Sequence, residues 1–354
     1  MADMVITELR EADLDAAARF LARESSGVEP ATAAAAHAAA RLHWLLLDNP
    51  ARRDDVPLGW LLRDDAGEVV GAMTCVPQRF AVDGRRLTAL MSADYYVSPP
   101  HRGQGLGIFL RYLRLGDRFP LYCTTAGAAT GPLWARFGGA AIAGQDHELL
   151  GVAAPAAVIE EAVWRRSGSR WLARVAGGVA AAAPGGGWRR RPADDADLEP
   201  LTSADAAAAV VLQEPAGVLA AVRDRSFLHW RHFSRDAAAR GVYAYRRAGA
   251  AGPSLVVVDR CMRGHRGQVR GLTVSDLWGP LDPQDLPTLA ALLDSRYSGS
   301  YDTLTFRGQS PARQAALRRA GFVRHGFAAP LAWCIDRAGL LPTRDWYLVP
   351  ADAW

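Results

Sequence analysis

Three short segments of the chain recur in the same order, and this repeat constrains the fold more than any other feature. The offsets between the copies are 184, 186 and 183 positions. The pairs are Glu11–Asp15 with Asp195–Glu199, Leu42–Trp44 with Leu228–Trp230, and Phe137–Gly139 with Ala320–Phe322. One match of this length has little weight, but three at nearly one spacing predict two copies of one fold.

The alternation of strand and helix patterns agrees with two α/β copies. Each copy is expected to end on a strand, at Ala140–Leu150 and at Ala328–Ile335. A length of 354 residues also fits two domains. We therefore predict domains at residues 1–153 and 188–354, joined by a helical linker at 154–187.

The linker is expected to hold two helices, at Ala156–Arg166 and Arg170–Ala182. Trp171, Val175 and Val179 fall at i, i+4 and i+8, so this face of the second helix is expected to pack on a domain. The basic residues do not form one broad polar face, which favours a structural connector over a membrane-binding helix.

Composition excludes several chemistries. The chain has no lysine, so all 41 Lys+Arg positions are arginine. This removes Schiff-base lysines, the P-loop and the usual kinase site. The net charge of +4 is too diffuse to indicate nucleic acid. The four cysteines form no CxxC pair, and no metal site, signal peptide or membrane span is indicated, so we expect a cytoplasmic protein.

The stretch from Asp94 to Leu110 carries the clearest chemistry. An alternating strand runs into a loop with three glycines, and that loop opens an amphipathic helix. Backbone N–H groups of such a loop and the helix N-terminus attract an anion, and Arg102 adds a fixed charge. The order R-x-x-G-x-G differs from the dinucleotide fingerprint G-x-G-x-x-G.

The pattern Val97-x-Pro99-x-x-Arg102-x-x-Gly105-x-Gly107 resembles the acyl-CoA signature of the GNAT superfamily of N-acyltransferases, and the resemblance extends through Thr125–Gly139. It implies two tandem GNAT-like domains, each with a mixed, largely antiparallel sheet flanked by helices. It also implies which residues hold acetyl-CoA or another acyl-CoA. The loop would bind the pyrophosphate, and the strand end would pair with pantetheine and offer an N–H to the thioester oxygen. These residues are Arg102, Gly103, Gln104, Gly105, Leu106 and Gly107 in the loop, and Tyr96 and Val97 in the strand.

The second copy is expected to have lost this site. The string His265–Gln268 repeats His101–Gln104, but it lies at the wrong offset and precedes a strand pattern, which predicts a hairpin turn. The segment at the right offset is Trp278–Asp285, which is acidic and contains prolines. This segment offers an anion fewer hydrogen-bond donors than the loop of the first copy does.

Catalytic groups are harder to assign. Many GNAT relatives have an acidic tyrosine where Trp134 stands, and indole is no acid. Asp94 is a candidate base and Tyr122 a candidate replacement acid, although a capping or buried carboxylate and a core tyrosine are the alternatives. His43 and His229 occupy equivalent repeat positions, which favours a structural role.

The predicted reaction is transfer of an acyl group, acetyl by default, from acyl-CoA to an amine of a small molecule, amino sugar or peptide. Direct attack on the thioester is expected, because no Cys or Ser stands beside a base. The alternatives are transfer from an acyl carrier protein and a non-catalytic acyl-CoA sensor. No metal, nucleic-acid or membrane partner is expected, and the sequence does not indicate an oligomeric state.

Overall fold

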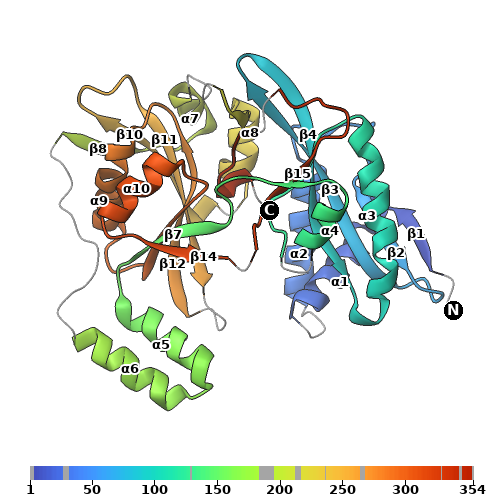
Figure 1. Cartoon of the computed structure of the whole chain (residues 1–354), viewed down its shortest axis with the longest axis horizontal. Coiled ribbons are helices and arrows are strands. Elements are labelled where there is room, and N and C mark those ends of the chain that lie inside the picture. Colours follow the sequence, from blue (N-terminus) through green and yellow to red (C-terminus); the bar gives the residue numbers. More distant parts are fainter. Residues whose placement is uncertain are drawn as a thin grey trace.

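The computed structural model describes residues 4–26, 32–127, 130–182, 195–211, 217–235, 237–263, 268–327, 329–342 and 345–352. Two α/β halves lie side by side, and a helical hairpin projects below one of them (Figure 1). Each half is built around one sheet.

The two sheets have the same strand order. In the first sheet the order is β1 (Val5–Glu8), β2 (Gly59–Arg63), β3 (Val69–Val82), β4 (Arg85–Val97), β5 (Leu121–Cys123), β15 (Trp333–Ile335) and β6 (Ala140–Ala141). In the second it is β8 (Ala196–Pro200), β10 (Arg240–Arg247), β11 (Ser254–Arg263), β12 (Val269–Trp278), β13 (Thr303–Arg307), β7 (His147–Val152) and β14 (Val323–Gly326). Every neighbouring pair is antiparallel except β4–β5 and β12–β13, which are parallel. The mixed, largely antiparallel sheets predicted for two copies are confirmed.

The last strand of each copy lies in the sheet of the other copy. Strand β7 of the first copy lies between β13 and β14, and β15 of the second lies between β5 and β6. The single strand expected at Ala140–Leu150 is therefore two strands in different sheets. The expected domain boundary at residue 153 divides the chain by sequence. The sheets do not respect this boundary, because each contains strands from both copies. Alternation of apolar residues identifies a strand but not its partner.

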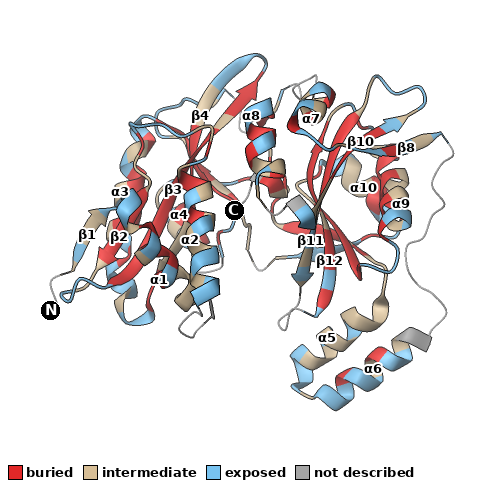
Figure 2. Ribbon diagram, turned by 180° about the vertical axis from the view of Figure 1, so that it is seen from behind, coloured by how far each residue is buried: buried red, intermediate tan, exposed pale blue. Residues whose placement is uncertain are grey.

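The helices cover both faces of each sheet. Those of the first copy are α1 (Leu14–Ser26), α2 (Thr32–Leu46), α3 (Leu106–Leu113) and α4 (Gly131–Arg136). Those of the second are α7 (Ala204–Val210), α8 (Arg225–Leu228), α9 (Leu286–Tyr297) and α10 (Pro311–Arg319). One apolar core includes residues of α1, α2, α7 and α8 together with both sheets, so the two copies share it. The buried strands on either side of this core are visible in Figure 2.

The repeat residues Trp44 and Trp230 meet in this shared core. Their rings stack with centroids 5.0 Å apart. The indole of Trp44 donates to the carbonyl of Trp230 at 3.0 Å, and the indole of Trp230 donates to the carbonyl of Trp44 at 2.9 Å. This reciprocal contact explains why the tryptophans recur. The neighbouring His43 and His229 are exposed.

The other two repeat matches have opposite outcomes. Gly138 and Gly321 follow α4 and α10 with φ of 83° and 99°, so both end their helix in a left-handed turn that glycine favours. The match of Glu11–Asp15 with Asp195–Glu199 is wrong. Asp13 belongs to the helical start of α1, whereas Asp197 lies in strand β8.

The linker forms the predicted helices, α5 (Pro155–Ser167) and α6 (Arg170–Ala182). The prediction that Trp171, Val175 and Val179 pack on a domain is wrong, because all three side chains are exposed. In the part of the chain that the structure describes, no helix has both the length and the apolar character to cross a bilayer.

Two short strands complete the first sheet. Strand β9 (Leu219–Ala221) pairs with β3, and β16 (Trp346–Tyr347) pairs with β9. A segment from each end of the second copy thus reaches the first. The string His265–Gln268 falls between the paired strands β11 and β12, as a hairpin turn would, but residues 264–267 lie outside the described ones.

Candidate functional site

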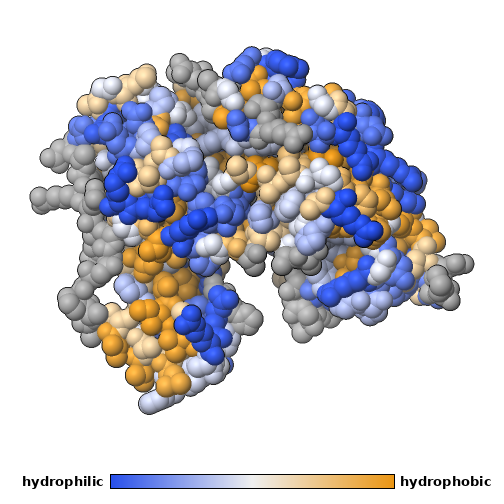
Figure 3. All heavy atoms as spheres, in the orientation of Figure 1, coloured by the Kyte–Doolittle hydropathy of each residue, from blue (hydrophilic) through white to orange (hydrophobic). Residues whose placement is uncertain are grey.

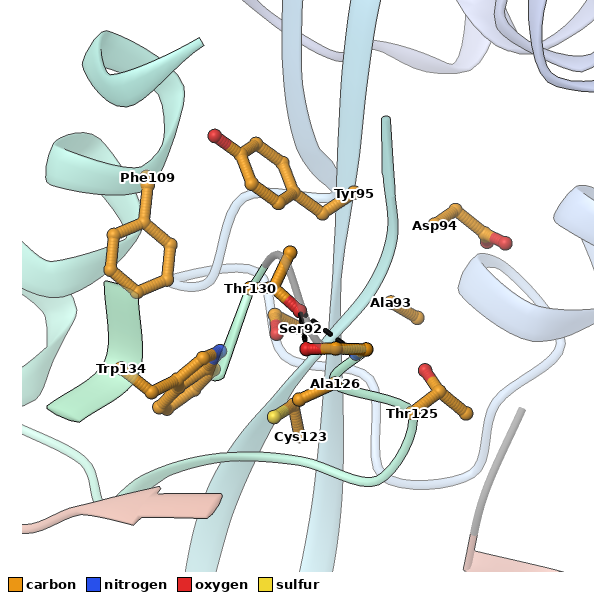
Figure 4. A pocket seen from close by; sticks show the side chains of 11 residues that line it. Ser92, Ala93, Asp94, Tyr95, Phe109, Cys123, Thr125, Ala126, Thr130 and Trp134 are labelled. Carbon is orange, nitrogen blue, oxygen red and sulfur yellow. Dashed lines mark hydrogen bonds between the residues drawn. The ribbon is translucent and has the colours of Figure 1, made fainter. Parts of the chain in front are cut away.

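A crevice opens in the first sheet where β4 and β5 separate. The two strands pair only at Leu90–Leu121 and Met91–Tyr122. Beyond Met91, β4 pairs with β3 alone. The space between the strands is a cavity of about 220 Å³ (Figure 4). It is lined by Ser92, Ala93, Asp94, Tyr95, Phe109, Cys123, Thr125, Ala126, Gly127, Thr130 and Trp134.

A β-bulge in β4 shapes this cavity. Ala72 pairs with Tyr96 and Thr74 with Ala93, so two β4 residues, Asp94 and Tyr95, stand opposite one residue of β3. Asp94 has φ of 51°, in the left-handed region, and such bulges bend a strand and re-aim its side chains. Figure 4 shows Tyr95 turned towards α3 and Asp94 turned away from it.

The Asp94 carboxylate is held by Arg41. Its Oδ2 accepts from Arg41 Nη1 of α2 at 3.1 Å, and the Thr74 hydroxyl, 3.3 Å from the same oxygen, shares its one proton with the Ala93 carbonyl at 3.0 Å. Asp94 is also the one carboxylate among the residues that line the cavity. The structure therefore brings this predicted residue to the crevice, already engaged by an arginine.

Tyr122 lies away from the cavity. It is fully buried, its hydroxyl donates to Gln78 Oε1, and its ring contacts Phe80 and Trp346. Its neighbour Cys123 lines the cavity, and adjacent strand residues point to opposite faces. The structure thus gives Tyr122 the core position that the sequence left as the alternative to an acid.

The predicted loop is a turn of 3-10 helix at Pro99–Gln104. Its side chains Arg102 and Gln104 are exposed, as is Leu106 at the start of α3. The amide of Gly105 donates to the carbonyl of Arg102 at 3.3 Å, so the loop itself uses this donor. The start of the segment is fixed, because the hydroxyl of the preceding Ser98 donates to Glu24 Oε1 at 2.8 Å.

One of the three loop glycines is restricted by packing. A Cβ at Gly105 would lie 2.8 Å from Val97 Cγ2 and 3.1 Å from the Tyr95 hydroxyl oxygen. A Cβ at Gly107 would meet only Ile6 Cδ1, the end of a half-buried side chain that can rotate away, and a Cβ at Gly103 would meet no atom within 4 Å. Close approach of the loop to the sheet thus explains Gly105 but not the other two glycines.

Strand residues Tyr96 and Val97 are anchored next to this loop. Their partners in β3 are Ala72 and Gly71, and the Tyr96 ring contacts Phe20 of α1. Since β4 has no β5 partner here, its edge towards the crevice is where an extended ligand could pair with backbone groups.

The cavity wall on the α3 and α4 side is aromatic. Trp134 is buried, with its ring centroid 5.5 Å from that of Phe109. Burial raises the pKa of the Tyr95 phenol and of the Cys123 thiol. Both groups are therefore protonated at neutral pH, which leaves Cys123 a poor nucleophile.

Sequence reasoning missed three hydroxyl groups of the cavity, those of Ser92, Thr125 and Thr130. The Thr130 hydroxyl accepts from the amide of Gly127 at 3.0 Å and closes the turn before α4 (Figure 4). Alternation along β4 could have identified Ser92, because it turns Ser92 to the face of the sheet opposite to that of its neighbour Ala93. The other two belong to an irregular loop, where periodicity gives no signal.

The parallel pair extends further in the second copy. Strands β12 and β13 pair at four positions, from Gly271–Thr303 to Val274–Phe306, and only the end of β12 after Val274 lacks a β13 partner. The turn after β12 contains Asp282 and Asp285, and Asp285 is buried and bridged to Arg247. Two carboxylates thus stand where the first copy has its loop.

A mixed sheet whose parallel central pair separates beside a glycine-rich loop defines the fold of the GNAT superfamily. Residues 20–110 match the model of the acetyltransferase (GNAT) family. The resemblance drawn from the loop sequence is confirmed for this fold.

Solved structures of the same fold extend the likeness over nearly the whole chain. A probable N-acyltransferase from Enterococcus faecalis is 12% identical with a TM-score of 0.57, covering 94% of this chain and 72% of that one. The N-myristoyltransferase of Saccharomyces cerevisiae with bound myristoyl-CoA is 11% identical with a TM-score of 0.57, covering 99% and 85%. Eis1 from Mycobacterium abscessus is 18% identical with a TM-score of 0.51, covering 94% and 73%. No curated protein matches the sequence.

Proposed function

We propose that the chain is an N-acyltransferase that moves an acyl group from acyl-CoA to an amine. The observation that carries this proposal is the open crevice between β4 and β5, which lies beside the Arg102–Gly107 loop in the first copy. An acyl-pantetheine needs an extended channel with unpaired strand edges, and its phosphates need donors at one end. The first copy offers both.

The second copy is proposed to bind no acyl-CoA. Its parallel strands remain paired for two more positions than those of the first copy, and the carboxylates of Asp282 and Asp285 accept from backbone N–H groups at the start of the following helix, where an anion would need those donors. Its role in this proposal is structural, because it contributes strand β15 and half of the shared core.

Direct attack of the amine on the thioester is the proposed route. Cys123 is the one thiol that lines the cavity, and its raised pKa leaves it protonated. Asp94 is proposed to receive or orient the ammonium of the acceptor, since a carboxylate at the crevice attracts a cation. Arg41 would then have to share or release its contact with Asp94.

A non-catalytic acyl-CoA sensor is the second candidate. The observation in its favour is Trp134, which fills the wall where relatives place an acidic tyrosine and which cannot donate a proton to a thiolate. Measured turnover separates the two candidates.

The test is release of free CoA from acetyl-CoA and longer acyl-CoAs in the presence of a library of amines, with mass spectrometry of the products. We expect turnover for wild type and for the control Arg318→Ala, an exposed arginine of α10. Asp94→Asn should lower kcat by about a hundredfold to ten-thousandfold, the range typical for loss of a general base. Acyl-CoA binding without turnover for any amine would favour the sensor.

A further inference from the structure

The α5–α6 hairpin carries the densest group of exposed apolar side chains. Of the eleven large apolar residues that are exposed in the described part of the chain, four lie within nine positions of α6. We call these four the apolar stripe: Trp171 (70% exposed), Leu172 (45%), Val175 (48%) and Val179 (68%). Figure 3 shows the hydrophobic surface over the hairpin at the lower left. Clustered exposed apolar residues mark an interaction surface, whereas scattered ones do not.

The apolar stripe faces away from the rest of the molecule. Helix α6 packs on α5 through Ala173 and Gly177, which are buried. A Cβ at Gly177 would lie 3.2 Å from the carbonyl oxygen of Ala156. At about 100° per residue, the stripe is centred roughly 160° around the helix from this contact. The hairpin also projects beyond both sheets (Figure 1), so the stripe can meet a broad surface.

Charge selects the kind of surface. Four exposed arginines, Arg165, Arg166, Arg170 and Arg174, lie at or near the turn of the hairpin. Helix α6 has no acidic residue. The hairpin's two carboxylates, Glu160 and Glu161, are both on α5 and only half-buried. Arg174 lies about 60° around α6 from Trp171, at the edge of the stripe, and the other three arginines are at the turn end of the hairpin, so the exposed charge next to the stripe is cationic.

A second copy of this chain is a poor occupant. Two α6 helices that met through their stripes would each bring Arg174 to the edge of the contact, and α6 has no carboxylate that could pair with it. A surface with anionic groups outside and an apolar interior matches both the arginines and the apolar stripe of the hairpin.

We propose that the α5–α6 hairpin docks on an anionic lipid bilayer, with the apolar stripe in the headgroup boundary and the arginines at the lipid phosphates. Tryptophan and arginine are typical of helices that lie in this interface. At 13 residues, α6 lies on the bilayer and does not cross it. The sequence favoured a connector because the basic residues do not form one broad polar face. In the structure the four arginines of the hairpin are exposed at or near its turn, and the stripe does not pack on a domain.

The test is sedimentation of the full chain with sucrose-loaded vesicles of phosphatidylcholine, with or without about one third phosphatidylglycerol. We expect binding to the anionic vesicles, weaker binding to the neutral ones, and loss of binding at high salt. The double variant Trp171→Ala/Val179→Ser should bind about tenfold or more weakly. Arg170→Gln/Arg174→Gln should also weaken binding, by about fivefold per charge.

The matched control is Met262→Ser/Val323→Ser, which removes two exposed apolar side chains (60% and 54%) of strands β11 and β14, outside the hairpin. It should bind vesicles like wild type. Thermal unfolding and CoA binding should be unchanged in all variants, so failure of the lipid proposal leaves the acyltransferase proposal intact. No binding of wild type to anionic vesicles, or equal binding by the stripe variant, would overturn the proposal. A stripe-dependent dimer in lipid-free sedimentation, or stripe-dependent capture by an acidic peptide but not by vesicles, would overturn it as well.

Discussion

At the scale of residues, alanine variants of the loop glycines test which of these positions are restricted by packing within the protein. Gly105→Ala places a methyl group 2.8 Å from Val97 Cγ2. We expect it to lower the free energy of unfolding by about 1–3 kcal/mol, as overpacking does. Gly107→Ala meets only the terminal carbon of Ile6 and Gly103→Ala meets open space, so neither should lower it as much. Urea unfolding measures all three, and equal stability of the three variants would contradict the packing explanation.

A buried charge cluster predicts how stability depends on pH. Asp276 binds Arg223 Nε at 2.8 Å and His232 Nε2 at 3.1 Å, and all three side chains are buried. Burial lowers the pKa of His232 to about 4, from an ordinary value of 6.5. Burial alone would raise the pKa of Asp276, but Arg223 and His232 hold it down at about 2.

The unfolded chain therefore binds the His232 proton before the folded one does. Stability from this group is complete above pH 6.5 and is lost as the pH falls towards 4, and Asp276 adds a further loss between about 4 and 2. We expect wild type to lose about 2 kcal/mol more than His232→Gln between pH 7 and pH 5. Equal losses in urea unfolding at the two pH values would show that His232 is not the cause.

The sequence predicted the site's location better than its chemistry. The residues around Arg102–Gly107 follow a strand and open a helix as expected, because glycine spacing and helix periodicity are local signals. Asp94 reaches the crevice only because a β-bulge interrupts alternation, which periodicity does not reveal. Tyr122 misses the crevice for the opposite reason, since regular alternation turns it into the core.

At the scale of elements, the exchanged strands tie the copies together. Cys334 of β15 pairs with Tyr122 on one side and Ala140 on the other. We expect Cys334→Pro to cost about 3 kcal/mol or more, because proline cannot donate within a central strand. Asp65→Pro is the control, since Asp65 is the second residue of a turn closed by Gly67 N–H to the Asp64 carbonyl. Equal stability of both variants, or an independently stable fragment 1–153 with full CoA affinity, would contradict this role.

The exchange is the part of the fold that the sequence could not predict. Segments 147–152 and 333–335 have apolar residues that suit either sheet, so their strand character is local but their partner is not. Leu149 is buried in the core of the second copy and Ile335 in that of the first. The bounds of the two linker helices were predicted within one residue at each end. The exposure of the apolar face of α6 was not predicted, because exposure depends on where the other elements lie.

At the scale of the whole molecule, the two halves share one architecture and differ at the candidate site. They keep the same strand order and the same type of bulge in the central strand, at Asp94–Tyr95 and near Ser275. They differ in how far the parallel pair extends, and in the charge of the turn that follows. Trp44 and Trp230 join the two across the shared core. This difference supports the proposal that the first copy binds the ligand and the second holds the first in shape.

Calorimetric titration of the chain with CoA and acetyl-CoA tests this asymmetry most directly. We expect one ligand per chain. Arg102→Ala should weaken the affinity by about tenfold or more, because charge-assisted contacts to phosphate are worth about 1.5–3 kcal/mol. Arg318→Ala on the second copy should bind like wild type. Two ligands per chain, no binding at all, or an Arg102→Ala affinity equal to that of wild type would contradict a single acyl-CoA site in the first copy.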